Sequence, residues 1–264
     1  MTVKISGILM FLSLTFLFLS GCQKDVTQSK NATQSFNSLP LSSDNASAAD
    51  LPGVYRTPSG NLKLVLQPGP DIGHDAWIEY SPTNSSYAIH NSNGADEIHT
   101  LAWTTGGDIV IQRILLKFEE LSQIPATAPV QQATLYLYGL TSSDQLPQGD
   151  SYFPGSPYDS YGPNDSYIRR ITSKWDEHNV TWNTMPSSTV NNESLIPPST
   201  KQWGSNTSGD VTKIVKTFVT NPKTNNGFIL SLTNENIYHS YGFYASETTT
   251  ASKRPKLIII YSPN

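Results

Sequence analysis

The chain has 264 residues, 21 acidic and 17 basic side chains, a formal net charge of −4, and one cysteine, Cys22. The negative balance gives no reason to expect nucleic acid as a partner, because nucleic-acid-binding domains present a basic surface. The single cysteine excludes an internal disulfide bond and a cysteine-based metal cluster.

The N-terminus has the pattern of a secretion signal. Lys4 precedes an apolar run, Ile8 to Leu19, that is shorter than the roughly 20 residues of a transmembrane helix and fits a signal-peptide core. Leu19-Ser20-Gly21-Cys22 resembles the bacterial lipobox, so we expect residues 1–21 to be cleaved and Cys22 to be lipidated. The alternative is an ordinary secretory peptide with an unrelated cysteine.

A lipid anchor at Cys22 predicts where the protein resides. Cleavage removes Lys4 and no acid, so the formal charge changes from −4 to −5. The lipid would be the only contact with the membrane, and the remaining chain would be extracytoplasmic. Gln23 after the cysteine favours the outer membrane or cell surface of a bacterial envelope.

Residues 22–50 form the predicted linker. They are rich in Ser, Asn, Thr, Gln and Ala, with few large apolar side chains such as Phe36. Such a composition buries too little surface to offset the entropy of ordering. We therefore expect a flexible tether.

Residues 51–264 read as one all-β domain, a jelly-roll-like β-sandwich. Short β-branched or aromatic segments alternate with Gly, Pro, Asn and Ser, as is typical of strands separated by turns. In 133–138, Ala, Leu and Leu alternate with Thr, Tyr and Tyr, the period of two of a half-buried strand. Strands are predicted at Leu62–Gln67, Ala76–Tyr80, Ile109–Phe118, Gln132–Tyr138, Tyr167–Thr172, Phe228–Leu232, Gly242–Ala245 and Lys256–Tyr261.

The segment Trp175–Asn183 places two tryptophans around a polar turn. Exposing a Trp ring is costly, and a buried indole N–H needs a partner. The segment therefore predicts a β-corner, with Trp175, Trp182 or both closing the end of a sheet. A sugar-stacking platform is the alternative.

One short helix is predicted near residue 215. Val211, Ile214, Val215 and Phe218 have the spacing of a single apolar stripe. Asp210 is the expected N-cap, and Asn221-Pro222 the expected stop.

Several motifs in order resemble a known family. They are Asp71-Ile-Gly-His-Asp75, Arg113-Ile-Leu-Leu-Lys117-Phe118, Ala133-Thr-Leu-Tyr-Leu-Tyr138, Trp175–Asn183, Asp210-Val-Thr212, Asn226-Gly-Phe228, Phe243-Tyr-Ala-Ser-Glu247 and Arg254-Pro-Lys-Leu257. Together they resemble the disaggregatase-related (DNRLRE) domain, which is similar to family-96 carbohydrate-binding modules. The resemblance implies a jelly-roll β-sandwich that binds polysaccharide without chemistry, with acidic, alginate-like glycans as a plausible target.

The stretch 145–167 is the first candidate site. It is long, without a strand or helix pattern of its own, and such loops are often functional. Tyr152, Tyr158 and Tyr161 lie in it among Asp, Asn and Ser. Their rings are candidates for stacking on pyranose rings, and packing onto the sandwich is the alternative.

Arg113 and Lys117 are the second candidates. They lie on one face of a predicted strand and would suit the carboxylates of uronic acids. Ion pairs with neighbouring acids are the alternative.

Asp71, Asp75 and Glu247 are candidate ligands for a structural Ca²⁺. The first two flank a Gly turn near the start of the domain, and Glu247 lies near its end, where the termini of jelly-roll modules often meet. Calcium takes six to eight oxygen ligands, so carbonyl groups would have to complete the site. Asx turns are the alternative, and no cofactor is required for binding.

No catalytic motif is present. The five histidines lack His-Glu-x-x-His spacing, and no Gly-x-Ser-x-Gly elbow occurs. A polysaccharide lyase that uses Tyr, His and Arg remains compatible with the composition, since such residues need only converge in space. The predicted function is non-catalytic polysaccharide binding at the cell envelope. An adhesive or structural domain that contacts protein or matrix is the alternative.

Overall fold

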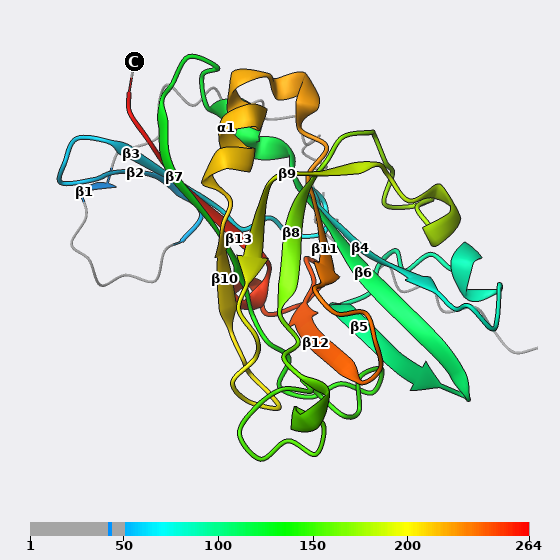
Figure 1. The fold of residues 1–264 in the computed structure, drawn as a ribbon. Coiled ribbons are helices and arrows are strands. Elements are labelled where there is room, and N and C mark those ends of the chain that lie inside the picture. The colour runs from blue at the N-terminus through cyan, green and yellow to red at the C-terminus, as the bar shows by residue number, and fades with distance from the viewer. Residues whose placement is uncertain (1–41, 44–50, 264) are drawn as a thin grey trace, which may run out of the picture. The chain divides into compact units, whose positions relative to one another are not determined.

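The computed structural model describes residues 42–43 and 51–263 (Figure 1). These residues all fall within one compact unit, Leu39–Asn264. The predicted signal peptide, Cys22 and most of the predicted linker lie outside the described residues. Ser42–Ser43, inside that linker, form a short strand. Among the described residues, no helix has the length and apolar character needed to cross a membrane.

The first sheet has six strands in the order β1-β2-β3-β13-β7-β10. β1 pairs in parallel with β2, and the other neighbours are antiparallel. The strands are β1 (Ser42–Ser43), β2 (Gly53–Arg56), β3 (Leu62–Leu66), β7 (Val130–Leu137), β10 (Thr207–Asp210) and β13 (Lys256–Tyr261).

The second sheet has seven strands, in the order β12-β5-β6-β11-β8-β9 with β4 also paired to β6. β4 lies along one edge of β6, and β5 and β11 follow each other along the opposite edge. The sheet therefore divides beside β6. Its strands are β4 (Gly73–Tyr80), β5 (Glu97–Thr105), β6 (Asp108–Phe118), β8 (Ser166–Ile171), β9 (Ser188–Ile196), β11 (Phe228–Leu232) and β12 (His239–Tyr244).

One α-helix and several 3₁₀ turns complete the described structure. α1 (Thr212–Thr220) lies at one end of the sandwich, opposite the long segment that follows β7 (Figure 1). The 3₁₀ turns are η2 (Tyr87–Ile89), η3 (Glu119–Gln123), η4 (Asp159–Tyr161), η5 (Trp182–Thr184), η6 (Pro222–Thr224) and η7 (Ala251–Lys253).

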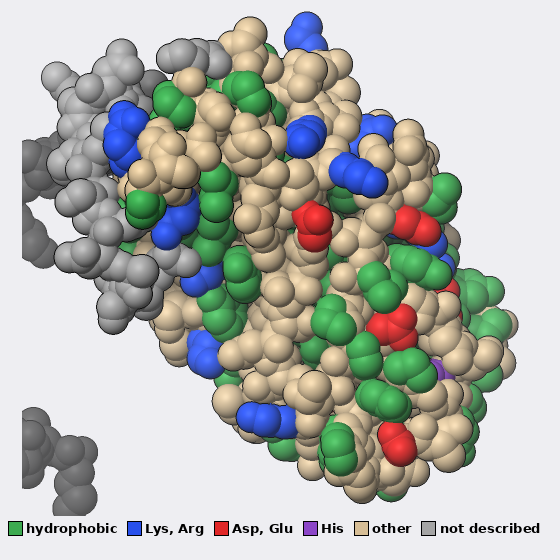
Figure 2. Space-filling model, turned by 60° about the vertical axis from the view of Figure 1, so that its left-hand side comes forward, with side chains coloured by type: hydrophobic (Ala, Val, Ile, Leu, Met, Phe, Trp, Pro, Cys, Tyr) green, Lys and Arg blue, Asp and Glu red, His purple; other side chains and the backbone are tan. Residues whose placement is uncertain are grey.

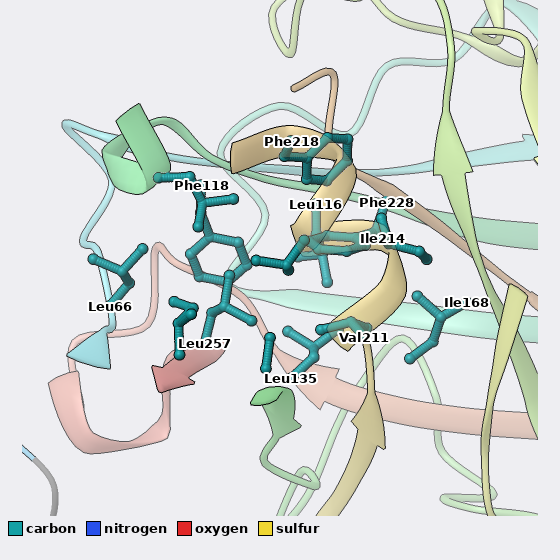
Figure 3. Packing of buried hydrophobic residues seen from close by; sticks show 14 of the residues in the cluster. Leu66, Leu116, Phe118, Leu135, Ile168, Val211, Ile214, Phe218, Phe228 and Leu257 are labelled. Carbon is teal, nitrogen blue, oxygen red and sulfur yellow. The ribbon is translucent and has the colours of Figure 1, made fainter. Parts of the chain in front are cut away.

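The main core lies between the two sheets and under α1. Side chains from β3, β6, β7, β8, β11 and β13 meet those of the helix there (Figure 3). Leu135 and Leu257 come from paired strands of the first sheet, and Leu116 and Phe228 from paired strands of the second. The all-β sandwich with one short helix is therefore confirmed.

Each of the eight predicted strand segments overlaps an observed strand. β1, β2, β5, β9 and β10 were not predicted. β9 and β10 are edge strands, and most of their side chains are polar and exposed or half-buried. Edge strands often lack an alternating apolar pattern, because an apolar edge with unpaired backbone N–H and C=O groups would promote pairing with other chains.

The structure confirms the predicted apolar stripe of the helix, but the N-cap residue is not the predicted one. Ile214, Val215 and Phe218 are buried, as is Val211, which is the N-cap residue. Asp210 is instead the last residue of β10, paired with Thr134. Its Oδ1 still accepts the Thr212 N–H at 2.9 Å. The carboxylate therefore provides a partner for a free N–H group of the first helical turn, although Asp210 precedes the N-cap residue by one position.

The Trp175–Asn183 corner covers the outer face of the second sheet rather than its end. Both rings pack against a second apolar cluster, which includes Leu115 of β6. Leu115 alternates with core residues of β6, so this cluster lies on the opposite face from the main core. Trp175 Nε1 donates to the Asn226 carbonyl at 2.8 Å, which supplies the partner that a buried indole needs.

Candidate functional site

Four aromatic rings form a partly exposed cluster, which we call the aromatic platform: Trp103, Tyr158, Tyr161 and Tyr238. The Trp103 ring centroid lies 4.6 Å from that of Tyr158 and 4.8 Å from that of Tyr238. Tyr161 meets Tyr238 edge-on at 5.1 Å. Tyr161 is 47% exposed and the other three rings are half-buried, so the platform presents ring surface to solvent.

Three separate segments position these rings. Trp103 lies near the end of β5, Tyr238 directly precedes β12, and the other two tyrosines flank η4. β5 and β12 are paired neighbours, with Ala102 opposite His239, which brings Trp103 and Tyr238 together. η4 belongs to the segment 139–165, drawn in green at the end of the sandwich opposite α1 (Figure 1).

Hydrogen bonds fasten the segment 139–165 to β12. The Ser151 N–H donates to the Ser240 carbonyl at 3.0 Å, and the Ser240 N–H donates back to Ser151 Oγ at 3.0 Å. Asn164 Nδ2 donates to the same carbonyl at 2.7 Å. Gly242 leaves room for this packing, because a Cβ there would lie 2.7 Å from Leu146 Cδ2. The platform is thus held in place before any ligand arrives.

Asp150 is a buried acid that links the segment 139–165 to β12. It is 3% exposed, and its Oδ1 accepts the Gly242 N–H at 3.0 Å. Its Oδ2 is buried without a hydrogen-bond partner. Burial raises the pKa of Asp150 to about 8, against which the Gly242 bond acts only partly.

The structure brings together two of the three tyrosines predicted from the sequence. Tyr158 and Tyr161 belong to the platform, whereas Tyr152 makes no ring contact with another described aromatic residue. The Tyr152 carbonyl instead accepts Ser199 Oγ–H. Trp103 and Tyr238 are not among the binding residues predicted from the sequence, because no local pattern links Trp103 on β5 to the segment that precedes β12.

Arg113 and Lys117 lie on the outer face of β6, and both are paired with acids. Arg113 Nε and Nη2 donate to the two carboxylate oxygens of Glu235 at 2.7 and 2.8 Å. The same guanidinium lies 4.6 Å from the Trp182 ring centroid. Lys117 Nζ lies 2.5 Å from Glu119 Oε1. Glycan binding by these two cations stays a prediction.

A second constellation consists of three carboxylates, Asp75, Glu177 and Glu247, which we call the carboxylate cluster. One oxygen from each lies within 4.8 Å of the other two. Asp75 comes from the start of β4, Glu177 from the tryptophan corner, and Glu247 from the segment after β12. Of the predicted ligands, Asp75 and Glu247 are brought together, whereas Asp71 is exposed and lies outside the cluster.

Burial and mutual repulsion dominate the electrostatics of this cluster. Asp75 is 4% exposed, and burial followed by the negative charge of Glu247 raises its pKa well above the usual range. Burial and the charge of Glu177 raise the pKa of Glu247. The Ser246 N–H donates to Asp75 Oδ2 at 2.8 Å, and His74 Nδ1 lies 3.1 Å from Glu177 Oε2.

Comparison with protein families gives one match. Residues 155–261 match carbohydrate-binding module family 96. No curated protein matches the chain. The family 96 match confirms the resemblance and indicates carbohydrate binding.

The segment that matches family 96 contains only some of the residues of the aromatic platform and of the carboxylate cluster. It contains Tyr158, Tyr161 and Tyr238 of the platform, while Trp103 comes from outside it. Both sheets contain strands of the matched and the unmatched part, and strands of the two parts are paired with each other, as in β12 beside β5. Completing the platform therefore requires both parts of the sandwich.

Proposed function

We propose that this protein binds polysaccharide without catalysing a reaction. The aromatic platform is the observation that supports the proposal. Indole and phenol rings offer apolar faces for the C–H surface of sugar rings, and their O–H and N–H groups are available for hydroxyls. The family 96 match over three of the four platform rings supports the same ligand class.

We propose an acidic, alginate-like polysaccharide as the ligand. The support is the sequence resemblance together with the cationic side chains on the outer surfaces. We further propose that residues 1–21 are a signal peptide and that lipidated Cys22 anchors the protein at the bacterial envelope. In this arrangement the domain holds glycan outside the cytoplasm, the lipid is its only membrane contact, and nucleic acid is not a partner.

The test is a glycan array with the full chain, followed by calorimetry with the best ligands. We expect binding to at least one acidic polysaccharide. Absence of binding to every acidic and neutral polysaccharide would overturn the proposal and favour an adhesive domain that contacts protein or matrix. Incubation with alginate and pectin tests the non-catalytic role, and sustained release of unsaturated or reducing ends would contradict it.

We also propose that the carboxylate cluster holds a structural Ca²⁺. Calcium–oxygen distances are about 2.3–2.6 Å, so oxygens about 5 Å apart or less can share one ion. The oxygens of Asp75, Glu177 and Glu247 meet that limit. Burial and then mutual repulsion raise the pKa values of Asp75 and Glu247, and a bound cation would stabilise the charged form of both carboxylates. Carbonyl groups and water would complete the coordination.

Calcium is expected to raise the melting temperature of the protein. A ligand present at 100 times its Kd stabilises by about 2.7 kcal/mol, or roughly 5–10 °C for a domain of this size. A melting curve with calcium and with chelator measures the difference. Asp75→Asn should abolish it, and Asp71→Asn, which alters an exposed acid outside the cluster, should leave it intact. Equal midpoints with calcium and chelator would contradict the site.

A further inference from the structure

The outer face of the first sheet carries a strip of tyrosine and lysine side chains. Tyr136 and Lys256 face each other across β7 and β13. Lys256 Nζ lies 5.9 Å from the Tyr136 ring centroid and 5.5 Å from that of Tyr138. Lys253 Nζ lies 5.8 Å from the Tyr138 centroid. We call these four residues the lysine–tyrosine strip.

The alternation of the strands directs this strip outward. Leu135 and Leu257, which flank Tyr136 and Lys256 in sequence, are fully buried in the main core. The four strip residues are half-buried, so their outer surfaces remain accessible. Figure 2 turns forward the side that is on the left in Figure 1 and shows cationic side chains in a row beside apolar ones.

The two lysines have no acidic partner within the part of the chain that the structure describes. The ion pairs there involve other cations, such as Arg113, Lys117 and Arg169. A cation–π contact uses the charge of an ammonium group but leaves its three N–H donors for other acceptors. Asp210, at the edge of this sheet, already accepts from Thr212.

We infer that the lysine–tyrosine strip is a second contact surface for the ligand and that it recognises the acidic groups of an anionic polysaccharide. The inference rests on the proposed function. Rings and ammonium groups alternate over neighbouring strands, so sugar rings can lie against the tyrosines while carboxylate or sulfate groups meet Lys253 and Lys256. A linear polymer fits an open strip of this kind better than a compact ligand does.

The strip also differs from the other candidate surfaces. The aromatic platform has no cation–π contact among the described residues. Arg113 and Lys117 are neutralised by Glu235 and Glu119. The platform therefore supplies stacking, and the strip supplies selectivity for negative charge. Tyr138 directly precedes the segment that holds Tyr158 and Tyr161, so one continuous segment joins the two surfaces.

The test replaces both lysines by glutamine, Lys253→Gln with Lys256→Gln, in the full chain. Calorimetry would compare alginate, a sulfated polysaccharide and a neutral polysaccharide. We expect about tenfold weaker binding of the acidic polymers, a shallower dependence of that binding on salt, and unchanged binding of the neutral polymer. The matched control is Lys201→Gln with Lys223→Gln, which removes the same charge from two exposed lysines outside the strip.

The outcomes separate this inference from the proposed function. If the chain binds no polysaccharide, both the proposed function and the inference about the strip are overturned. If acidic polysaccharide binds equally well to the double variant and the unaltered chain, only the strip is overturned, and the same holds if the control pair loses as much affinity. Lysine-dependent binding to anionic phospholipid vesicles, with none to acidic polysaccharide, would assign the strip to a membrane surface and overturn the inference.

Discussion

Replacing Trp103 by alanine is expected to weaken polysaccharide binding by about thirtyfold. This residue touches both Tyr158 and Tyr238, so its loss removes one stacking surface and the support of two others. Aromatic residues at the centre of a binding surface typically contribute about 2 kcal/mol or more, which corresponds to that factor. Calorimetry with the best ligand of the glycan array measures the change.

Two further variants show whether the loss reflects the surface or the fold. Tyr161→Ala removes the most exposed platform ring, so it should weaken binding while leaving the melting temperature within a few degrees. Tyr87→Ala removes a half-buried tyrosine from η2, outside the platform, and should leave affinity unchanged. Full affinity in Trp103→Ala, with its fold retained, would show that the platform does not bind the ligand.

Replacing Asp150 by asparagine is expected to stabilise the protein at neutral pH. The pKa of Asp150 is about 8 in the folded chain, and its ordinary value is 3.8. Because the folded state binds this proton more tightly than the unfolded state, the stabilisation is complete below about pH 4 and is lost as the pH rises towards 8. Asparagine keeps an oxygen for the Gly242 N–H and carries no charge.

The expected size of this effect follows from the pKa difference. One pKa unit corresponds to about 1.4 kcal/mol, so keeping this carboxyl protonated in the folded chain lowers the unfolding free energy at pH 7 by up to about 4 kcal/mol relative to its value below pH 4. Melting curves from pH 4 to pH 8 should show the midpoint of the unaltered chain falling relative to that of Asp150→Asn. Asp144→Asn, in an exposed position of the same segment, is the control. If the melting midpoints of Asp150→Asn and the unaltered chain change by the same amount between pH 4 and pH 8, the prediction is contradicted.

The pH range matters for function because Asp150 helps to hold the segment 139–165. Its carboxylate accepts from Gly242 of β12, the strand that Tyr238 directly precedes. Ionisation without a second partner for Oδ2 weakens this attachment. We therefore expect the platform to be more firmly held in mildly acidic solution than in alkaline solution.

The sequence alone determined the class of fold and most of its interior strands. Alternation of apolar and polar residues predicted β7, and apolar spacing predicted α1, because both patterns follow from local backbone geometry. The tryptophan corner and the motif order predicted the family resemblance. The edge strands β9 and β10 were missed, since a polar strand at the edge of a sheet resembles a loop in sequence.

Only the tertiary structure decided how the sites are composed. Trp103 meets Tyr238 because β5 pairs with β12, and Glu177 joins Asp75 because the tryptophan corner folds over the second sheet. A strand pattern indicates which face a side chain occupies, but it does not indicate which distant strand lies beside it. Local sequence thus specified the elements, and long-range strand pairing determined which of their side chains meet.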